Sequence, residues 1–280
     1  MSATQLTRDG LTFDVTEDGP PDGEPVVLLH GWPQHSDSWD AVVPRLTEAG
    51  YRTIRMDQRG YSPGARPRGR RAYRMTELMA DAAALIDQYG GSAHVVGHDW
   101  GAGVAWALAT AHPVKVRSLT SVSVPHPGAF LRALVTSRQG LMSWYMLFFQ
   151  LPWLPERLLR GQLARVLTRS GLSAAHARRD AARFTEPGAM TGPLNWYRAL
   201  FLTNPRQASG PVRRPTLFVW SDGDTALGRH AAENTATYVR GPYQFEVLHG
   251  VSHWIPDEAP EQLASLLLAH LKRWPTEPPV

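Results

Sequence analysis

The stretch that decides the fold is VVGHDWGAG at residues 95–103. The apolar run at 93–96 predicts a short buried strand, and residues 104–111 predict a helix, so the chain must turn sharply between them. Asp99 lies at the apex of that turn. Glycines at 97, 101 and 103 lack the Cβ atoms that would collide in a tight strand-to-helix turn, as in the G-x-S-x-G nucleophile elbow. We therefore expect Asp99 to stand at the end of a buried strand.

The aspartate at the apex replaces the serine of that elbow, and this changes the expected chemistry. A serine hydroxyl needs a base before it can attack, whereas a carboxylate, with a pKa of about 3.9, is already ionised at neutral pH. A carboxylate attacks amides poorly but can displace a halide or a strained ether oxygen at an sp³ carbon. Asp99 therefore predicts a reaction that passes through an alkyl ester. The alternative interpretation is an ordinary Gly-Asp turn.

Composition narrows the class of protein. The chain has 280 residues, 43% of them hydrophobic, and suits one large α/β domain with an insertion. Its formal charge of +4 is modest, and we interpret the densest basic run, at 66–74, as a solvated loop or helix start and not as a nucleic-acid site. The absence of cysteine excludes disulfides and thiolate metal sites.

Neither a targeting segment nor a membrane span is predicted. The first residues lack the apolar core of a signal peptide. The longest apolar stretch, at 141–154, is interrupted by Gln150 and Pro152 and is too short to cross a bilayer. We therefore expect a cytoplasmic protein without a membrane partner.

Strand and helix patterns alternate along most of the chain. Strands are expected at 11–16 (as an edge strand), 25–29, 51–56, 93–96, 116–122, 215–220 and 244–248, and helices at 36–49, 76–89, 104–111, 229–239 and 260–274. Ser36 or Asp37 would cap the first helix, and Thr76 the second. The alternation stops after residue 124, where helical patterns follow one another. These patterns predict a mostly parallel sheet flanked by helices, with a core domain at 1–124 and 212–280 and an inserted helical cap at 125–211.

The partners of the nucleophile are expected in loops that follow later strands. Asp222 and Asp224 both follow the strand at 215–220, and spacing alone does not separate them as the acid. His253 is favoured over His249 as the base because it lies further out in its loop and can reach back over the sheet edge.

Several motifs together resemble one family. HGWP at 30–33, DQRGYS at 57–62, GHDWG at 97–101, Asp224 and His253 are similar to those of the soluble, α/β-hydrolase-fold epoxide hydrolases, relatives of the haloalkane dehalogenases. SWYMLFFQ at 143–150 and PLNWYR at 193–198 resemble the two lid-tyrosine segments of that family, and the dehalogenases lack this tyrosine pair. The resemblance extends over most of the chain. Gln34, often glutamate in the family, and Ser252, more usually glycine, depart from the pattern.

The resemblance implies a role for each matching position. The implied site consists of the nucleophile Asp99, the acid Asp224, the base His253, the epoxide-oxygen donors Tyr145 and Tyr197, and an oxyanion hole formed by the backbone N–H groups of Trp32 and Trp100. A phenol, with a pKa of about 10, stays protonated at pH 7 and can donate to an opening epoxide, which independently favours an epoxide over a halide.

The expected reaction is therefore hydrolysis of an epoxide to a vicinal diol through an ester on Asp99. A haloalkane or haloacid dehalogenase, and a catalytically silent ligand receptor, are the alternatives, and a serine-type esterase is disfavoured because no serine occupies the apex. No metal or organic cofactor is implied, since the histidines show no H-E-x-x-H spacing. The expected partners are a small-molecule epoxide and water, and not nucleic acid. The identity of the epoxide and the choice between monomer and homodimer stay open.

Overall fold

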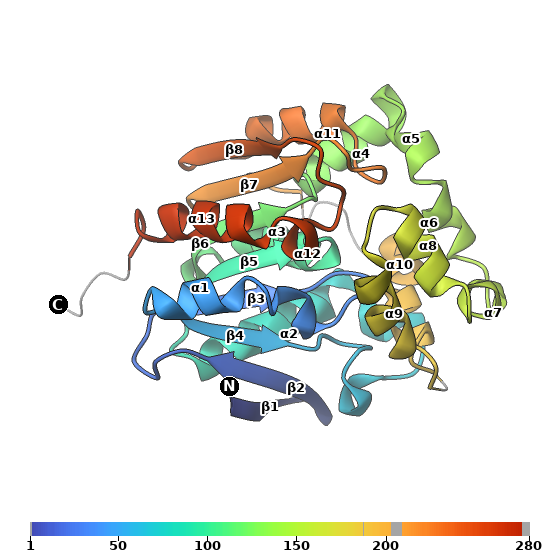
Figure 1. Ribbon diagram of the computed structural model, residues 1–280, viewed down its shortest axis with the longest axis horizontal. Coiled ribbons are helices and arrows are strands. Elements are labelled where there is room, and N and C mark those ends of the chain that lie inside the picture. Colours follow the sequence, from blue (N-terminus) through green and yellow to red (C-terminus); the bar gives the residue numbers. More distant parts are fainter. Residues whose placement is uncertain (1, 187, 203–208, 276–280) are drawn as a thin grey trace.

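A single mixed sheet organises the chain in this computed structural model, which describes residues 2–186, 188–202 and 209–275 (Figure 1). The strands are β1 (Ser2–Arg8), β2 (Leu11–Asp18), β3 (Pro25–Leu29), β4 (Arg52–Met56), β5 (Ala93–His98), β6 (Val116–Val122), β7 (Thr216–Ser221) and β8 (Tyr243–Leu248). Their spatial order is β1-β2-β4-β3-β5-β6-β7-β8. The β1/β2 and β2/β4 pairs are antiparallel, and all the others are parallel. The predicted fold class, a mostly parallel sheet flanked by helices, is confirmed.

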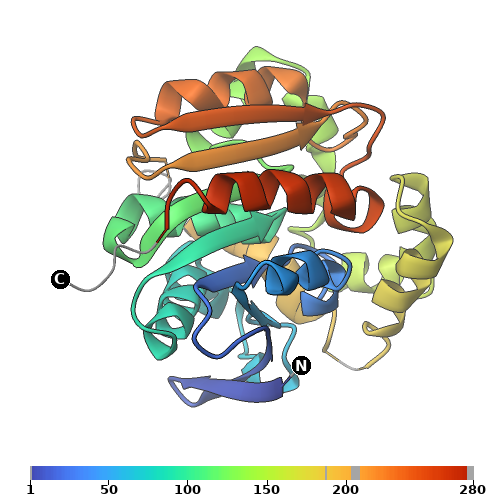
Figure 2. The ribbon, with the colours of Figure 1, turned by 60° about the vertical axis from the view of Figure 1, so that its left-hand side comes forward.

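Helices cover both faces of the sheet because its central strands are apolar on both sides. In β3, Val26 and Leu28 pack against α1 (Val43–Glu48) and α13 (Pro260–Leu271). Val27 and Leu29 point the other way, toward α2 (Met75–Gln88) and α3 (Trp100–Ala111). All four side chains are fully buried. The sheet is therefore the middle layer of a three-layer core, with α1 and α13 on the near side in Figures 1 and 2.

Between β6 and β7 the described chain is helical. This segment contains α4 (Pro127–Thr136), α5 (Gln139–Met142), α6 (Trp144–Phe148), α7 (Leu154–Leu159), α8 (Leu163–Arg169), α9 (Ala174–Ala182) and α10 (Thr191–Ala199). Helices α6 to α10 gather beyond the carboxyl ends of the parallel strands (Figure 1), whereas α4 packs beside α11 (Arg229–Asn234). The division into a core and a cap at 125–211 stays a prediction, and residues 187 and 203–208 lie outside the described residues.

Several expected boundaries are wrong. The strand predicted at 11–16 is not at the edge, because β1, which we did not predict, pairs with its outer side. The helix predicted at 36–49 is broken into a 3-10 turn at Ser36–Trp39 and α1, and neither Ser36 nor Asp37 caps it with its side chain. Helix α2 begins at Met75, so Thr76 is not its cap.

The end of the chain also differs from the expectation. A short helix, α12 (Ile255–Glu258), precedes α13, which ends at Leu271 and not at 274.

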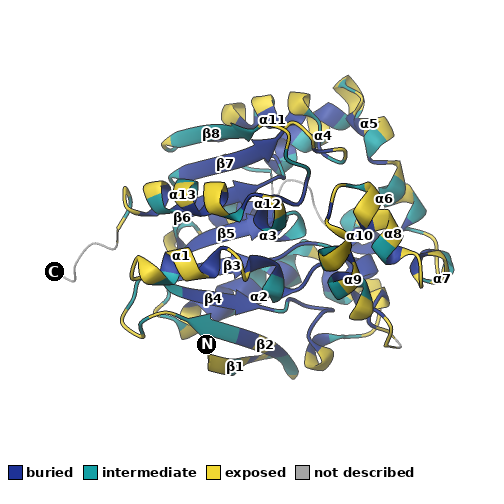
Figure 3. Ribbon diagram, in the orientation of Figure 1, coloured by how far each residue is buried: buried dark blue, intermediate teal, exposed yellow. Residues whose placement is uncertain are grey.

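Burial follows the layers: the strands are mostly buried, and exposed residues gather on the outer sides of α5 to α9 (Figure 3). In the described part of the chain, no helix combines the length and apolarity needed to cross a membrane.

Candidate active site

Asp99 occupies a strained turn between β5 and α3. Its backbone has φ 50° and ψ −121°, a conformation that costs a non-glycine residue about 1–3 kcal/mol. A Cβ on Gly97 would lie 2.3 Å from the carbonyl oxygen of Gly101, and one on Gly101 would lie 2.2 Å from that of Leu29. The expected role of Gly103 is wrong, because a Cβ there would meet nothing closer than 3.8 Å. Helix α3 also begins earlier than predicted, directly after Asp99.

The Asp99 carboxylate is held by backbone donors. The N–H of Trp32 donates to Oδ1 over 2.7 Å, and the N–H of Trp100 also hydrogen-bonds to the carboxylate. Gly31 makes this approach possible, since a Cβ there would lie 2.5 Å from Oδ1. The Asp99 side chain is still 15% exposed, so it is not sealed off from solvent.

His253 faces two carboxylates, one on each ring nitrogen. Its Nε2 lies 3.4 Å from Oδ2 of Asp99, and its Nδ1 lies 2.7 Å from Oδ2 of Asp224. The other oxygen of Asp224 accepts the backbone N–H groups of Ala226 and Leu227 over 2.7 and 2.9 Å. The imidazole therefore bridges Asp99 and a firmly held second carboxylate.

This geometry distinguishes Asp222 from Asp224, the two candidates for the acid that spacing alone left open. Asp222 pairs with His249 over 2.7 Å, in the same Nδ1-to-carboxylate arrangement as Asp224 and His253. That pair lies at the surface, with the His249 side chain 79% exposed. The structure therefore brings Asp224 and His253, and not Asp222 and His249, to Asp99.

Burial and charge act on the site in opposite directions. Burial alone would lower the pKa of His253, but the carboxylates of Asp224 and Asp99 outweigh it and raise that pKa to about 10. Burial would raise the pKa of Asp99, but the hydrogen bond and charge of His253 hold it below its usual value. At neutral pH the site therefore contains an ionised Asp99 facing an imidazolium.

Two phenols face this carboxylate from the helical segment. Tyr145 comes from α6 and Tyr197 from α10, with ring centroids 6.0 Å apart. The indole of Trp100 hydrogen-bonds to the Tyr197 hydroxyl, and the two rings meet edge to face at 5.0 Å. Burial and the charge of Asp99 raise the pKa of both tyrosines. Both phenols are therefore protonated donors at neutral pH.

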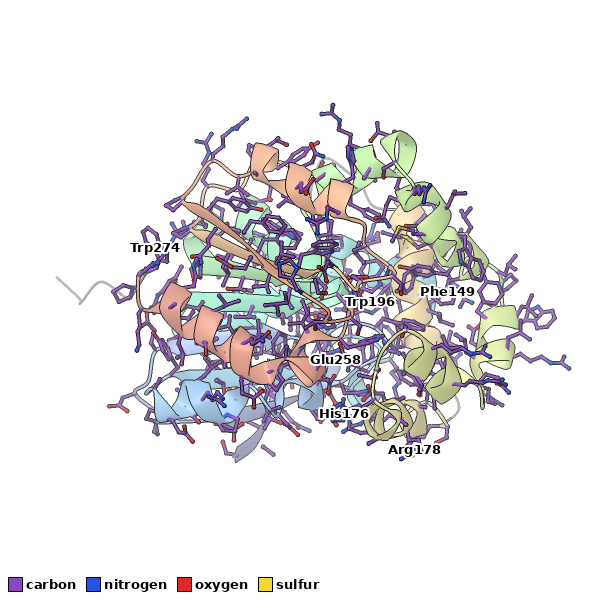
Figure 4. All side chains as sticks on the ribbon, turned by 45° about the horizontal axis from the view of Figure 1, so that its top comes forward. Phe149, His176, Arg178, Trp196, Glu258 and Trp274 are labelled. Atoms are coloured by element: carbon purple, nitrogen blue, oxygen red, sulfur yellow. The ribbon has the colours of Figure 1, made fainter. Side chains whose placement is uncertain are left out.

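Aromatic rings enclose this group of side chains. Phe149 lies 5.1 Å from the ring of Trp32, and Trp196 lies 5.5 Å from that of Trp100, centroid to centroid (Phe149 and Trp196 are labelled in Figure 4). We did not predict these contributions of Phe149 and Trp196, although both lie within the tyrosine-bearing segments singled out in the sequence. An apolar surround strengthens every charge interaction inside it.

Comparison with known proteins shows the family of this chain. The family described as "alpha/beta hydrolase fold" matches residues 24–260. The chain belongs to the α/β-hydrolase family. It is 35% identical to an AB hydrolase superfamily protein, YfhM, of Bacillus subtilis, over 95% of this chain and 96% of that protein. It is 31% identical to Epoxide hydrolase A of Mycobacterium tuberculosis, with the same coverage. The crystal structure of Epoxide Hydrolase A from Mycobacterium thermoresistibile matches with a TM-score of 0.85 and 29% identity over 99% of both chains.

Two side chains that the sequence analysis gave no role hold the His253 loop of this α/β-hydrolase. Nε2 of His98 and Oγ of Ser123 donate to the carbonyl oxygen of His253 over 2.9 and 2.8 Å. Burial and the charge of His253 lower the pKa of His98 to about 4, so its ring is neutral. The available signal was positional, because His98 ends β5 and Ser123 directly follows β6, at the sheet edge that carries the site.

The two departures from the family pattern have local partners. Nε2 of Gln34 donates to Asp180 of α9 over 3.1 Å and to Asp257 of α12 over 2.6 Å. Ser252 packs against Gly171, where a Cβ would lie only 2.4 Å from that of the serine. Among the residues described, no group of three or more His, Cys, Asp or Glu is arranged to hold a metal ion.

Proposed function

We propose that this α/β-hydrolase is an epoxide hydrolase that converts an epoxide and water into a vicinal diol. The observation that carries the proposal is the pair of protonated phenols, Tyr145 and Tyr197, beside a carboxylate that an imidazolium keeps ionised. The names of the relatives in Mycobacterium support the same reaction class. We also propose the segment 125–211, which supplies both tyrosines, as the cap over the site.

In the first half-reaction Asp99 is the nucleophile. Its Oδ2, not held by the N–H of Trp32, attacks an epoxide carbon, and the C–O bond of the ring breaks. The oxygen of the opened ring takes a proton from Tyr145 or Tyr197. The indole of Trp100 supports the phenolate at Tyr197, since a hydrogen-bond donor stabilises developing negative charge. The product of this step is a hydroxyalkyl ester on Asp99.

The proton then returns to the phenolate from the His253 imidazolium. Esterification favours this transfer because it removes the charge of Asp99, one of the two carboxylates that raise the pKa of His253. Asp224 remains and keeps the ring oriented through Nδ1. His253 is now neutral and presents Nε2 as a base.

In the second half-reaction His253 takes a proton from water, and the resulting hydroxide attacks the carbonyl carbon of the ester. The oxyanion forms on Oδ1, to which the backbone N–H of Trp32 donates, and the N–H of Trp100 hydrogen-bonds to the same carboxyl group. Collapse expels the diol oxygen, which takes the proton of the newly formed carboxyl group. Asp99 is again ionised and His253 again protonated, and the oxygen gained by the diol came from Asp99.

Intact-mass measurement of His253→Gln tests the proposal. Without the base, the ester should form and persist, and the protein mass should rise by the full mass of a styrene or aliphatic epoxide. In wild-type enzyme, a single turnover in heavy-oxygen water should give an unlabelled diol. Direct labelling of the diol on that first turnover would exclude the ester mechanism.

One observation favours a dehalogenase as second candidate. The buried indole Nε1 of Trp32 has no hydrogen-bond partner among the described residues and could donate to a departing halide. The same His253→Gln variant separates the two, because a haloalkane would add its mass less that of the hydrogen halide. Adducts from haloalkanes but from no epoxide would replace the proposed function with this one.

A further inference from the structure

Helices α5 and α6 and the bend that follows them expose a row of large apolar side chains. Leu141, Trp144, Leu147 and Leu151 are 78%, 64%, 67% and 44% exposed. Leu141 belongs to α5, Trp144 and Leu147 lie three residues apart on one side of α6, and Leu151 follows the end of α6. Tyr145 belongs to the same helix but points inward, toward Tyr197. The row is therefore the outer side of the helix that supplies a donor to the site.

The helical segment that carries this row is strongly basic. Residues 125–211 contain eleven arginines and three acidic residues, whereas the rest of the chain has 18 basic and 22 acidic residues. Seven of these arginines are exposed and form no ion pair with a described carboxylate: Arg132, Arg138, Arg157, Arg160, Arg165, Arg169 and Arg178. The molecule is therefore polarised, with its positive charge on the helical segment.

A groove of about 670 Å³ adjoins the apolar row. Its walls include Arg70, Arg157, Arg160 and the exposed indole of Trp153. Arg198, also in the lining, is already paired with Glu156 over 2.7 Å, so the other three arginines supply the positive charge. Guanidinium groups bind phosphate oxygens, and tryptophan favours the boundary between water and lipid.

We propose that this docking face, formed by the apolar row, Trp153 and the surrounding arginines, binds the surface of a membrane that contains anionic phospholipids. Exposed leucine and tryptophan would enter the headgroup region while unpaired arginines meet lipid phosphates. A second copy of the chain fits less well, because two such faces would bring like charges together. The sequence alone predicted no membrane partner, since it does not show which residues of the stretch 141–154 are exposed.

Docking would have a consequence for the proposed function, although the binding itself does not rest on it. Apolar epoxides dissolve in the bilayer, and the inner side of the docked helices carries Tyr145 and Tyr197. An enzyme docked in this way would take its substrate from the membrane surface.

Co-sedimentation of the full chain with vesicles tests the proposal without any substrate. We expect binding to equimolar phosphatidylcholine and phosphatidylglycerol, weakening as salt is added, and little binding to phosphatidylcholine alone. Each arginine near an anionic surface contributes roughly a fivefold increase in binding, so Arg157→Glu with Arg160→Glu should weaken binding by more than about twentyfold. Trp144→Ser with Leu147→Ser should weaken it at least about tenfold, because two apolar side chains that would enter the membrane are lost.

Matched variants outside the docking face provide the controls. Val114→Ser removes an apolar side chain that is 80% exposed on the surface of the core domain. Arg213→Glu with Arg240→Glu reverses two exposed charges on the same domain. Both should bind vesicles like the wild type, and melting temperatures should confirm that every variant is folded. Absence of binding to anionic vesicles, equal binding to neutral ones, or equal losses in the controls would overturn the proposal. So would sedimentation of the wild type as a dimer that Trp144→Ser with Leu147→Ser dissociates, since the face would then join two copies.

Discussion

Replacing Asp224 with asparagine should separate the two halves of the reaction. The carboxylate accepts three hydrogen bonds, from the backbone N–H groups of Ala226 and Leu227 and from Nδ1 of His253. An asparagine that keeps the two backbone bonds turns its NH₂ group toward His253. Nδ1 must then accept, so the neutral ring carries its proton on Nε2 and has no base to offer to water. Attack by Asp99 requires no such base.

The expected loss in the rate of ester hydrolysis follows from the charges around the imidazole. The pKa of His253 rises from a usual value of about 6.5 to about 10, which corresponds to about 5 kcal/mol. Asp224 is the larger of the two carboxylate contributions, and esterification removes that of Asp99. Losing Asp224 therefore removes on the order of 3 kcal/mol from the imidazolium that forms during ester hydrolysis, or at least about a hundredfold in rate. In a serine-protease triad, the same aspartate-to-asparagine change also fixes the wrong tautomer of the histidine, and the loss in kcat reaches about 10⁴-fold.

Quenched-flow mass spectrometry measures both steps. In Asp224→Asn the ester should form with a rate within about tenfold of wild type and then accumulate, while steady-state turnover falls by about 10²–10⁴. Asp222→Asn is the matched control, because it alters the same pairing with His249 at the surface and should leave turnover unchanged. If Asp224→Asn turns over at the wild-type rate, or loses ester formation and hydrolysis equally, the assigned role of Asp224 is wrong.

Three further predictions concern the tyrosines, pH and a buried ion pair. Tyr145→Phe and Tyr197→Phe should each slow ester formation by about 10²–10³, measured in single turnover, because each removes a donor to the epoxide oxygen. The folded-state pKa of His253 exceeds that of a free imidazole, so its contribution to stability is complete below about pH 6.5 and is lost as pH rises through about 10. The melting temperature should therefore fall over that range, less steeply in His253→Gln. Asp81→Asn should lower the free energy of unfolding by about 3–5 kcal/mol in urea titrations, because it leaves buried Arg59, which holds Asp81 over 2.7 and 2.8 Å, without its counter-charge.

Features encoded by local patterns were predicted from the sequence. Strands β3 and β6 have the predicted bounds. Strand β3 is a continuous apolar run, and β6 begins and ends with valine and carries Leu119 between polar residues. The turn at Asp99 was also predicted from a local pattern, because Gly97 and Gly101 stand where the neighbouring backbone leaves no room for a Cβ atom. Strand β1 was missed because one face of it is exposed and its sequence carries little apolar signal.

Contacts between distant segments could not be predicted in the same way. Asp222 and Asp224 both follow β7 and both pair with a histidine from the β8 loop. Only the path of that loop, held where His98 and Ser123 bind the carbonyl of His253, decides which pair reaches Asp99. No spacing rule contains that information, because the choice depends on where the ends of β5 and β6 lie relative to β7.

Gln34 departs from the family pattern, and the residues that it contacts explain why glutamine stands there. It follows the HGWP loop that supplies the Trp32 N–H, and its amide donates to Asp180 and Asp257, from α9 and α12. Burial raises the pKa of both carboxyl groups, so each needs donors to stay ionised. A glutamate at position 34 would place a third acid between them and offer no N–H. Glutamine is therefore the residue that fits between two acids, and the identities of residues 34, 180 and 257 depend on one another because together they join α9 to the loop that holds Asp99.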